Sequence, residues 1–582
     1  MSMLLRPFAG NSTAPTRSRT TMIADVIVLA AVAVIFWLLI KISQGVTEPI
    51  HGHQITSTIS TAPSELPYYA LRSLFRMFVA LFFSVVFTFG FATLAARNRR
   101  AEKVMLPLLD ILQSVPVLSF LSVTITIWLT LFPHSMLGVE CAAIFAVFTS
   151  QAWNMTFAFY QSLVTQPREL DEAARLLRLT KWQRFWQLDV PSGMIPLVWN
   201  GMMSFGGGWF FLTASEAISV NNKTYVVPGI GSYVGVAAER QQLGRVFLAI
   251  GVMIVMIIGV NVVFWRPLTA WAERFRIEDS ESAQAPRSLT LDLLRRSRVP
   301  QLALSAVRPV TRALEAGTRV FGLAEHPLQV KAGRRRAIDV VYAVVVIGLI
   351  CWGLTEMLLY INRTAGLGQF PHTFVLGLVT FARVLVLLVF ATVVWVPIGV
   401  WIGMNPKVNR LAQPVVQVLA SFPANFLFPI FTLVLINTGI SINIGGIVLM
   451  ALGAQWYILF NVIAGASAIP NDLREAATNL RLSRAQRWRS VILPSIFAAW
   501  VTGAITAAGG AWNASIVAEV VTYGKTTLTA TGLGAYIAQS TQHGNFGRML
   551  VGNMVMCIFV VGLNRSFWRR LYRLAETRYS LS

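Results

Sequence analysis

The sequence predicts an all-α, polytopic membrane protein made of two tandem six-helix domains, with about 12 transmembrane helices and pseudo-two-fold symmetry. Three observations support this prediction. The 582-residue chain is 55% hydrophobic and only 13% charged, which is far from the composition of a soluble domain. It contains many apolar runs of the roughly 20 residues that cross a bilayer. A pattern in its first half also returns 303 to 307 positions later in the second half.

The first half begins with a basic leader and an apolar run, Met22 to Ile40. We expect an uncleaved first span with its N-terminus in the cytoplasm, although a signal peptide would share these features. A polar stretch on the far side contains His51-Gly-His53, a spacing more typical of a solvated loop than of a metal site. The remaining predicted spans of this half are 68–96, 104–132, 139–165, 193–220 and 246–265.

A basic segment separates the halves and contains no spanning run. We interpret it as a cytoplasmic linker, in which Ser288–Arg298 and Leu302–Phe321 could form amphipathic surface helices. The expected organisation is a tail, first helix and periplasmic loop over 1–67, a first domain over 68–270, the linker over 271–336, and a second domain over 337–582. The second domain has a first helix at 337–361 and a core repeat at 375–575, and its other predicted spans are 372–404, 411–436, 442–468, 495–521 and 546–566.

The net charge of +23 lies mainly in segments that would share one side of the membrane, including residues 97–103, the linker and the C-terminal tail. This placement follows the positive-inside rule, and it predicts that these segments are cytoplasmic. Nucleic-acid binding is not expected, because no aromatic residues alternate with the basic runs. The three cysteines, Cys141, Cys351 and Cys557, lie in apolar spans and are expected to pack there, without a disulfide or metal.

A polar segment occurs twice, at Pro167–Ser192 and Pro470–Ser495. Each copy has an apolar stripe at helical spacing, followed by a capping-box pattern at Thr180–Gln183 or Ser483–Gln486. We therefore predict two short helices per copy, with a break near 179–180 or 482–483 and a closing proline at 191 or 494. A charged helical segment repeated between apolar spans indicates a docking surface.

The two copies carry Glu172-Ala173-Ala174 with Val190-Pro191, and Glu475-Ala476-Ala477 with Leu493-Pro494. This pattern resembles the EAA loop of ATP-binding-cassette (ABC) importer permeases. Where that family usually has a glycine, near Arg178 and Arg481, this chain has arginine in both copies. The resemblance covers about residues 70–270 and 375–575, and it implies two ABC type I importer permease domains of the bacterial inner membrane fused in one chain.

The resemblance also implies partners and a site. Two cytoplasmic ABC ATPase subunits would dock on the repeated segments, and a periplasmic or lipid-anchored solute-binding protein would act on the opposite face. The chain has no phosphate-binding G-x-x-x-x-G-K-[ST] loop, so ATP and magnesium are expected on the partner ATPase, with no cofactor and no enzymatic activity here. The residues assigned to ATPase coupling are Glu172, Ala173, Ala174, Leu177 and Arg178, with Glu475, Ala476, Ala477, Leu480 and Arg481.

By the same resemblance, the span after each EAA loop lines the translocation path. Pro107, Pro116, Pro414 and Pro423 are expected to interrupt helices in matching places and to free carbonyl groups that can line a cavity. The predicted path residues are Ser114, Pro116, Asn200, Trp209 and Glu216, with Ser421, Pro423, Trp512, Asn513 and Glu519. Two alternatives stay open. The small residues of these spans could serve only helix packing. The two glutamates near the outer span ends could form salt bridges or hydrogen bonds.

The loop pattern is most similar to permeases of the nitrate, sulfonate, taurine and bicarbonate group, which implies a small oxyanion or organic anion as solute. Ferric iron and thiamine permeases are alternatives. Two hypotheses place the chain in another functional class: a proton- or sodium-coupled secondary transporter, and a membrane scaffold that transports nothing. The secondary transporter would require titratable groups at mid-membrane. Five further residues show no partner pattern and are expected at the interface: His134, Glu140, Glu356, His372 and His543.

Overall fold

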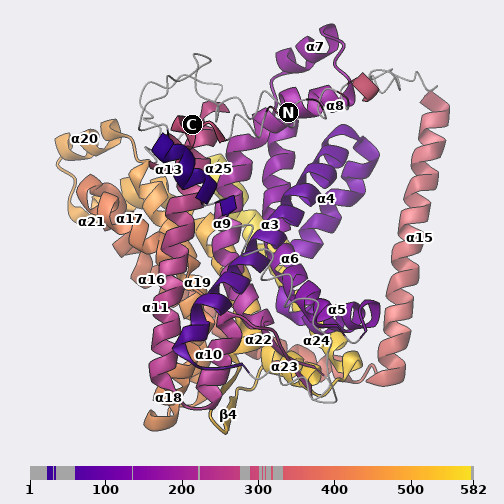
Figure 1. Ribbon diagram of the computed structural model, residues 1–582, viewed down its shortest axis with the longest axis vertical. Coiled ribbons are helices and arrows are strands. Elements are labelled where there is room, and N and C mark those ends of the chain that lie inside the picture. Colours follow the sequence, from indigo (N-terminus) through magenta and orange to yellow (C-terminus); the bar gives the residue numbers. More distant parts are fainter. Residues whose placement is uncertain are drawn as a thin grey trace.

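The computed structural model describes residues 22–30, 32–33, 59–133, 135–220, 223–275, 289–299 and 332–578, with a few positions between 305 and 318. Long helices run between two ends of the molecule, with short polar helices at one end and two β-hairpins at the other (Figure 1). The prediction of an all-α, polytopic protein is confirmed, apart from these two hairpins.

The first half consists of these elements in chain order: η2 (Pro63–Glu65), α3 (Leu66–Arg97), α4 (Arg99–Ser114), α5 (Val117–Leu131), α6 (Met136–Val164), α7 (Arg168–Leu176), α8 (Lys181–Arg184), the π-helical turn η3 (Phe185–Asp189), α9 (Val190–Ser215), β1 (Ala217–Val220), β2 (Lys223–Val226), α10 (Ile230–Glu239), α11 (Leu243–Val260), the π-helical turn η4 (Asn261–Trp265), α12 (Arg266–Ala272) and η5 (Glu273–Phe275).

Helix α13 (Leu289–Arg296) lies in the linker. The second half consists of α15 (Ala332–Thr364), α16 (Gln369–Met404), α17 (Pro406–Ser421), η6 (Ala424–Phe426), α18 (Phe428–Thr438), α19 (Ile442–Ser467), α20 (Asn471–Asn479), α21 (Arg484–Arg487), the π-helical turn η7 (Trp488–Ile492), α22 (Leu493–Ala518), β3 (Val520–Tyr523), β4 (Thr526–Thr529), α23 (Leu533–Gln542), α24 (Phe546–Leu563), the π-helical turn η8 (Asn564–Trp568) and α25 (Arg569–Arg578).

The internal repeat of the sequence is also a repeat of structure. Helices α7, α9, α10 and α11 each begin 303 positions before α20, α22, α23 and α24, and the π-helical turns η3 and η4 recur with the same offset as η7 and η8. The antiparallel hairpins repeat as well, with Ala217 opposite Val226 in one and Val520 opposite Thr529 in the other. The chain therefore contains two copies of one architecture.

Among the described residues, eight helical segments are long and apolar enough to cross a membrane: Pro63–Arg97, Met136–Val164, Leu243–Phe275, Val340–Thr364, Gln369–Met404, Ile442–Ser467, Arg484–Ala518 and Phe546–Ala575. Helix α9 fills the predicted span 193–220 but is not among the eight. Residues 31 and 34–40 of the predicted first span lie outside the described residues, as do His51, His53 and most of Leu302–Phe321.

The predicted single spans 104–132 and 411–436 are corrected by the structure. Each is two shorter helices, α4 and α5 or α17 and α18, which are separated at Pro116 or Pro423. A proline pushes the residue before it out of the helical region, and Val115 and Phe422 accordingly have ψ of 125° and 127°. Each proline thus creates a break at which the chain can change direction.

The closing role predicted for Pro191 and Pro494 is wrong. The chain runs from α8 through η3 into α9, with Pro191 in the first turn of α9. Just before this proline, the Val190 N–H donates to the Phe185 carbonyl, five residues back, and Leu493 and Trp488 form the matching bond. This wider turn accommodates a proline, which has no N–H and whose ring crowds the carbonyl four residues back in an α-helix.

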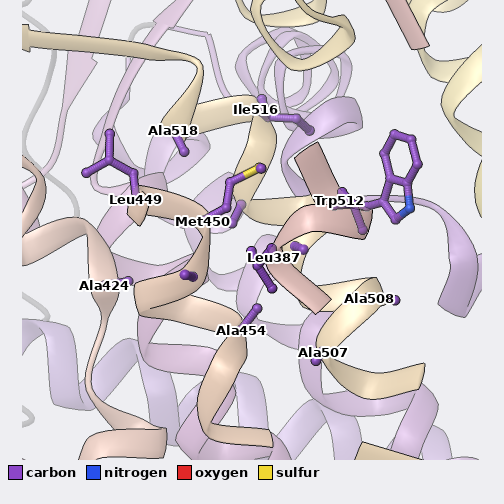
Figure 2. Close-up of a cluster of buried hydrophobic side chains, with 14 of the residues drawn as sticks. Leu387, Ala424, Leu449, Met450, Ala454, Ala507, Ala508, Trp512, Ile516 and Ala518 are labelled. Atoms are coloured by element: carbon purple, nitrogen blue, oxygen red, sulfur yellow. The ribbon is translucent and has the colours of Figure 1, made fainter. Parts of the chain in front are cut away.

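The short helices after the proline breaks pack against the opposite half. Ile125 of α5 is buried in a cluster made mainly by the second half, whereas Phe426 of η6 is buried in the cluster of the first half. Figure 2 shows part of the second-half cluster, where Leu387, Met450 and Ala454 lie close to one another. The two halves therefore share their cores through reciprocal insertions.

The described part of the linker contacts the start of the chain. Helix α13 falls within the predicted amphipathic stretch Ser288–Arg298. Just after its C-terminal end, Ser297 Oγ and the Arg298 N–H donate to the Asp25 carboxylate at 2.8 and 2.6 Å. The linker and the first described residues therefore meet.

Two glycines of α22 provide a test of this packing. A Cβ atom on Gly503 would lie 2.9 Å from the Tyr457 carbonyl oxygen of α19, whereas a Cβ on Gly509 would meet nothing within 4 Å. Gly503→Ala should lower the free energy of unfolding by about 1–3 kcal/mol, because the backbones must separate. Gly509→Ala should raise it by up to about 1 kcal/mol through helix propensity.

Thermal unfolding of both variants in detergent would check this difference in sign. Equal shifts in Tm for Gly503→Ala and Gly509→Ala would contradict the close packing of α19 on α22.

Candidate functional site

The two repeated polar segments, named here the coupling segments (residues 167–190 and 470–493), lie at the same end of the molecule (Figure 1). On each first helix one alanine, Ala174 or Ala477, is buried, whereas the leucine just after the helix, Leu177 or Leu480, is 72% exposed. Glu172, Ala173 and Arg178 are exposed, as are Glu475, Ala476 and Arg481. Each segment thus presents a bare leucine beside charged groups, an arrangement that suits contact with another protein.

Each coupling segment makes the same tight turn. Arg178 and Arg481 adopt left-handed conformations, with φ of 47° and 49°. In the first copy the Leu179 N–H donates to the Ala174 carbonyl at 3.1 Å and the Arg178 N–H to the Arg175 carbonyl at 3.0 Å. These two bonds define a Schellman motif, whose left-handed position favours glycine. The arginines therefore keep the turn that the resemblance assigns to a glycine.

The predicted capping boxes are present in both copies. The Thr180 hydroxyl accepts from the Gln183 N–H at 3.2 Å, and the Gln183 side chain accepts from the Thr180 N–H at 3.1 Å. Ser483 and Gln486 form the equivalent pair. Because Schellman motif and capping box follow each other directly, the angle between the two helices of each segment is held by backbone hydrogen bonds.

Ion pairs tie the first coupling segment to the spans. Asp171 of α7 bonds to Arg184 of α8, and Arg184 and Arg97 flank Asp189 at the start of α9. Arg97 is the last residue of α3, and its Nη1 atom also lies 3.9 Å from Asp171 Oδ1. Burial raises the pKa of the Asp189 carboxyl, although the Arg97 guanidinium acts in the opposite direction. The cluster links α7 to the C-terminal end of α3 and the N-terminal end of α9.

The second coupling segment is attached differently. Ile492 occupies the position that matches Asp189, and Met404 the position that matches Arg97. Arg474 Nη2 donates to the Ala466 carbonyl at 3.0 Å, and Arg487 Nη2 to the Thr478 hydroxyl at 3.2 Å. The described residues of this segment form no ion pair equivalent to Arg97–Asp189. The two copies share a shape but differ in the strength of their connection to the membrane helices.

At the opposite end, Glu216 and Glu519 are fully buried. Arg76 Nη1 donates to Glu216 Oε1 at 2.8 Å, and the Gly231 N–H donates to Oε2 at 2.6 Å. In the second half, Arg383 Nη1 donates to Glu519 Oε1 at 2.7 Å, and the Ala535 N–H donates to Oε2 at 2.9 Å. The alternative that both glutamates form salt bridges is the one the structure shows.

A hydroxyl completes each of these clusters. Ser73 Oγ donates to Glu216 and accepts from the Ile230 N–H, while Thr380 Oγ1 donates to Glu519 and accepts from the Leu533 N–H. Ser73–Arg76 and Thr380–Arg383 occupy matching positions of the two halves in the sequence, which does not show that they face the glutamates. Each cluster joins the first helix of the core (α3 or α16), the path span (α9 or α22) and the short helix after the hairpin (α10 or α23).

Glu140 is corrected from an interfacial residue to a buried ion-pair partner. It bonds to both Arg72 and Arg76. In the second half, Val379 matches Arg72 and Asn443 matches Glu140, so the acid and one of its two arginine partners are absent together. Asn443 Oδ1 there accepts from Arg383 Nη2 at 2.7 Å. Two arginines four residues apart in an apolar span were the signal for a buried acid.

The predicted path residues whose surroundings are described lie in several different places. Trp209 packs edge-on to Phe205, and Trp512 stacks on Phe559. Trp209 and Ser421 both line a cavity of about 30 Å³ between α9 and α17. Asn200 lines a separate hollow of about 530 Å³ beside the start of the first coupling segment.

Other path residues lie where the halves meet. Asn513 Oδ1 of α22 accepts from the Val117 N–H, directly after Pro116, at 2.9 Å. Asn425, two residues after Pro423, bonds to Thr213 of α9. Helix α4 ends at Ser114, whose side chain lies outside the described residues. The role of these residues in a translocation path stays a prediction.

Among the described residues, no group of three or more His, Cys, Asp or Glu side chains could hold a metal ion. Cys141, Cys351 and Cys557 are free thiols. His134 lies outside the described residues.

The Arg72–Glu140 pair provides a test of the outer cluster. Glu140→Asn alone should lower the free energy of unfolding by about 3–5 kcal/mol, because it leaves a buried arginine without its acid. The double change Arg72→Val/Glu140→Asn copies the second half and should recover most of that loss. Thermal unfolding in detergent measures both, and a single variant as stable as the parent would contradict a buried charge pair.

Comparison with known proteins agrees with this architecture. The family described as "binding-protein-dependent transport system inner membrane component" matches residues 87–266 and 395–580, which together make up more than half of the chain. The chain is 27% identical to the nitrate import permease protein NrtB of Synechococcus elongatus over 186 residues, covering 32% of this chain and 62% of NrtB.

Two further relatives are the glycine betaine/proline betaine transport system permease protein ProW of Escherichia coli, 24% identical over 38% of this chain and 60% of ProW, and the bicarbonate transport system permease protein CmpB of Synechococcus elongatus, 27% identical over 30% of this chain and 57% of CmpB. The chain thus spans about 60% of the length of each relative. With two matches in tandem, the chain belongs to the family of inner membrane components of binding-protein-dependent transport systems, and it holds two fused copies of the family's domain.

Proposed function

We propose that the chain is the transmembrane permease component of an ATP-driven importer, with two cytoplasmic ATPase subunits docked on the coupling segments. A solute-binding protein would deliver the solute at the opposite, hairpin-bearing end. The observation that carries this proposal is the pair of matching, exposed helix–turn–helix segments at one end of the molecule. Two equivalent docking sites suit two ATPase subunits, and the cleft between such subunits would close as ATP binds.

The geometry supports a way to pass that movement into the membrane. Asp171 on α7 and Asp189 before α9 are joined through Arg97 and Arg184, so displacement of the first coupling segment would pull on both α3 and α9. In the second half the same force would travel through the continuous turn from α21 into α22. The solute path would then open alternately to each side as the two states exchange populations.

For the solute we propose a small oxyanion or organic anion. Two of the relatives carry nitrate and bicarbonate in their names. Another relative is named for glycine betaine and proline betaine, so ligand screening must include zwitterions, ferric iron and thiamine as well as anions. Calorimetry of the cognate solute-binding protein against these compounds would test the class, and tight binding of betaine without anion binding would refute it.

The geometry gives less support to a proton- or sodium-coupled transporter. Such coupling needs a titratable group that exchanges with solvent near mid-membrane. The buried acids Glu140, Glu216 and Glu519 each bond to arginine, and none is exposed. In liposomes with the ATPase inside, uptake should require ATP and persist with a proton uncoupler. Uptake that needs a gradient but no ATP would favour the secondary transporter.

Charge reversal in the coupling segments tests the docking proposal. Glu172 and Glu475 are exposed on the first helix of each segment. The double change Glu172→Arg/Glu475→Arg should reduce ATP-dependent uptake by at least about tenfold, since like charges would replace favourable contacts across a protein interface. Membrane insertion should be unchanged, because both side chains are outside the spans.

The matched control is Lys525→Glu, an exposed charge reversal at the opposite end, in the turn between β3 and β4. Co-purification of the ATPase should be lost in the double variant and kept in the control. Normal uptake by the Glu172→Arg/Glu475→Arg protein would defeat the docking proposal.

A further inference from the structure

A groove of about 1750 Å³ runs along the first half at the end that bears the coupling segments. One wall is α3, with Val86 and Phe89, and the other is α15, with Tyr342 and Val346. The groove exceeds the roughly 300–1,000 Å³ of sites for small molecules. Figure 1 shows α15 standing apart from the rest of the bundle. Only 6% of the spanning window of α15 is buried, so this wall of the groove is open to the bilayer along its length.

Basic side chains surround the cytoplasmic end of this groove. Arg97 and Arg184 are engaged with Asp171 and Asp189. In contrast, Arg99, Lys103 and Lys181 line the same groove and, within the described part of the chain, have no acidic partner. A surplus of positive charge above an apolar trough complements a molecule with an anionic head and long apolar chains.

Trp186 and Thr93 also line the groove, and their Nε1 and Oγ1 atoms are buried in its wall with no hydrogen-bond partner within the described residues. Trp182 and Trp186 add aromatic rings at the same level, where amphipathic rings commonly meet lipid headgroups.

We propose that this groove binds one anionic glycerophospholipid of the cytoplasmic leaflet. Its headgroup lies among Arg99, Lys103 and Lys181, and its acyl chains lie along α3 and α15. A soluble anion would use the basic rim but not the apolar trough, and so the combined lining favours a lipid.

The second half keeps only part of this site. The positions that match Arg97 and Arg99 hold Met404 and Pro406, and the position that matches Trp182 holds Ala485. Positive charge nevertheless remains there, because Lys407, Arg410 and Arg484 match Arg100, Lys103 and Lys181. The chain therefore binds one such lipid, in the first half, next to the coupling segment that is anchored by ion pairs.

Native mass spectrometry of the purified full-length protein, titrated with phosphatidylglycerol or with phosphatidylethanolamine of the same acyl chains, tests the proposal. One bound phosphatidylglycerol and a clear preference over phosphatidylethanolamine are expected. Arg99→Gln/Lys103→Gln/Lys181→Gln should weaken its binding on the order of 100-fold, since each basic residue near an anionic headgroup contributes about a factor of five to ten. The matched control, Lys407→Gln/Arg410→Gln/Arg484→Gln, should leave binding unchanged.

A second variant tests the apolar trough without changing charge. Gly90 lines the groove, and a Cβ there would meet nothing within 4 Å, so Gly90→Phe can fill the space without disturbing the fold. It should weaken phosphatidylglycerol binding at least about tenfold while Tm is unchanged. Equal losses in both triple variants, full binding in Gly90→Phe, or competition by millimolar inorganic phosphate would each overturn the lipid site, the last in favour of a free-anion site.

Discussion

Two buried carboxylates, Glu216 and Glu519, hold the outer end of each half together. Each is out of contact with water and is compensated by an arginine, a hydroxyl and a backbone N–H from different helices. A buried charge of this kind is stable only when all of its partners are in place. The carboxylate therefore fixes three elements at one point. Gly229 and Gly532 show how tight that point is, because a Cβ on either would lie within 2.3 Å of a carboxylate atom.

With the outer end fixed in this way, the positions available for movement lie elsewhere. Pro116 and Pro423 break the helices that cross between the halves, and their flanking residues bond to the opposite half at Asn513 and Thr213. Relative movement of the halves would alter these cross-half contacts while the outer clusters moved as rigid units. The force proposed to come from the coupling segments enters at the other end of the same helices, so α9 and α22 would act as levers between the two.

The features that could be predicted from the sequence are those that local chemistry determines. The capping boxes at Thr180 and Ser483 need only residues three apart, and the duplication needs only a comparison of the halves. The breaks at Pro116 and Pro423 were predicted from the prolines, but the same prediction was wrong for Pro107 and Pro414, which lie inside the continuous helices α4 and α17. Whether a proline breaks a span depends on how the next helix packs, and here α5 and η6 enter the core of the other half.

The features that could not be predicted depend on contacts across long sequence separations. Glu140 is 64 residues from Arg76, and nothing near it in the chain indicates that it faces two arginines. In the second half, Val379 stands in place of Arg72 and Asn443 in place of Glu140. This paired replacement can be interpreted only once the contact between Arg72 and Glu140 is known.

The coupling segments differ by a similar paired replacement, since Ile492 replaces Asp189 and Met404 replaces Arg97. Each of these paired replacements removes an ion pair from the second half, whereas the first half keeps it. A duplicated chain that loses acid and base in pairs keeps each half electrostatically balanced while it lets the two halves diverge in stiffness. We therefore expect ion pairs to add to backbone continuity in transmitting force through the first half, whereas the second half relies on backbone continuity and on hydrogen bonds such as that from Arg474 to the Ala466 carbonyl.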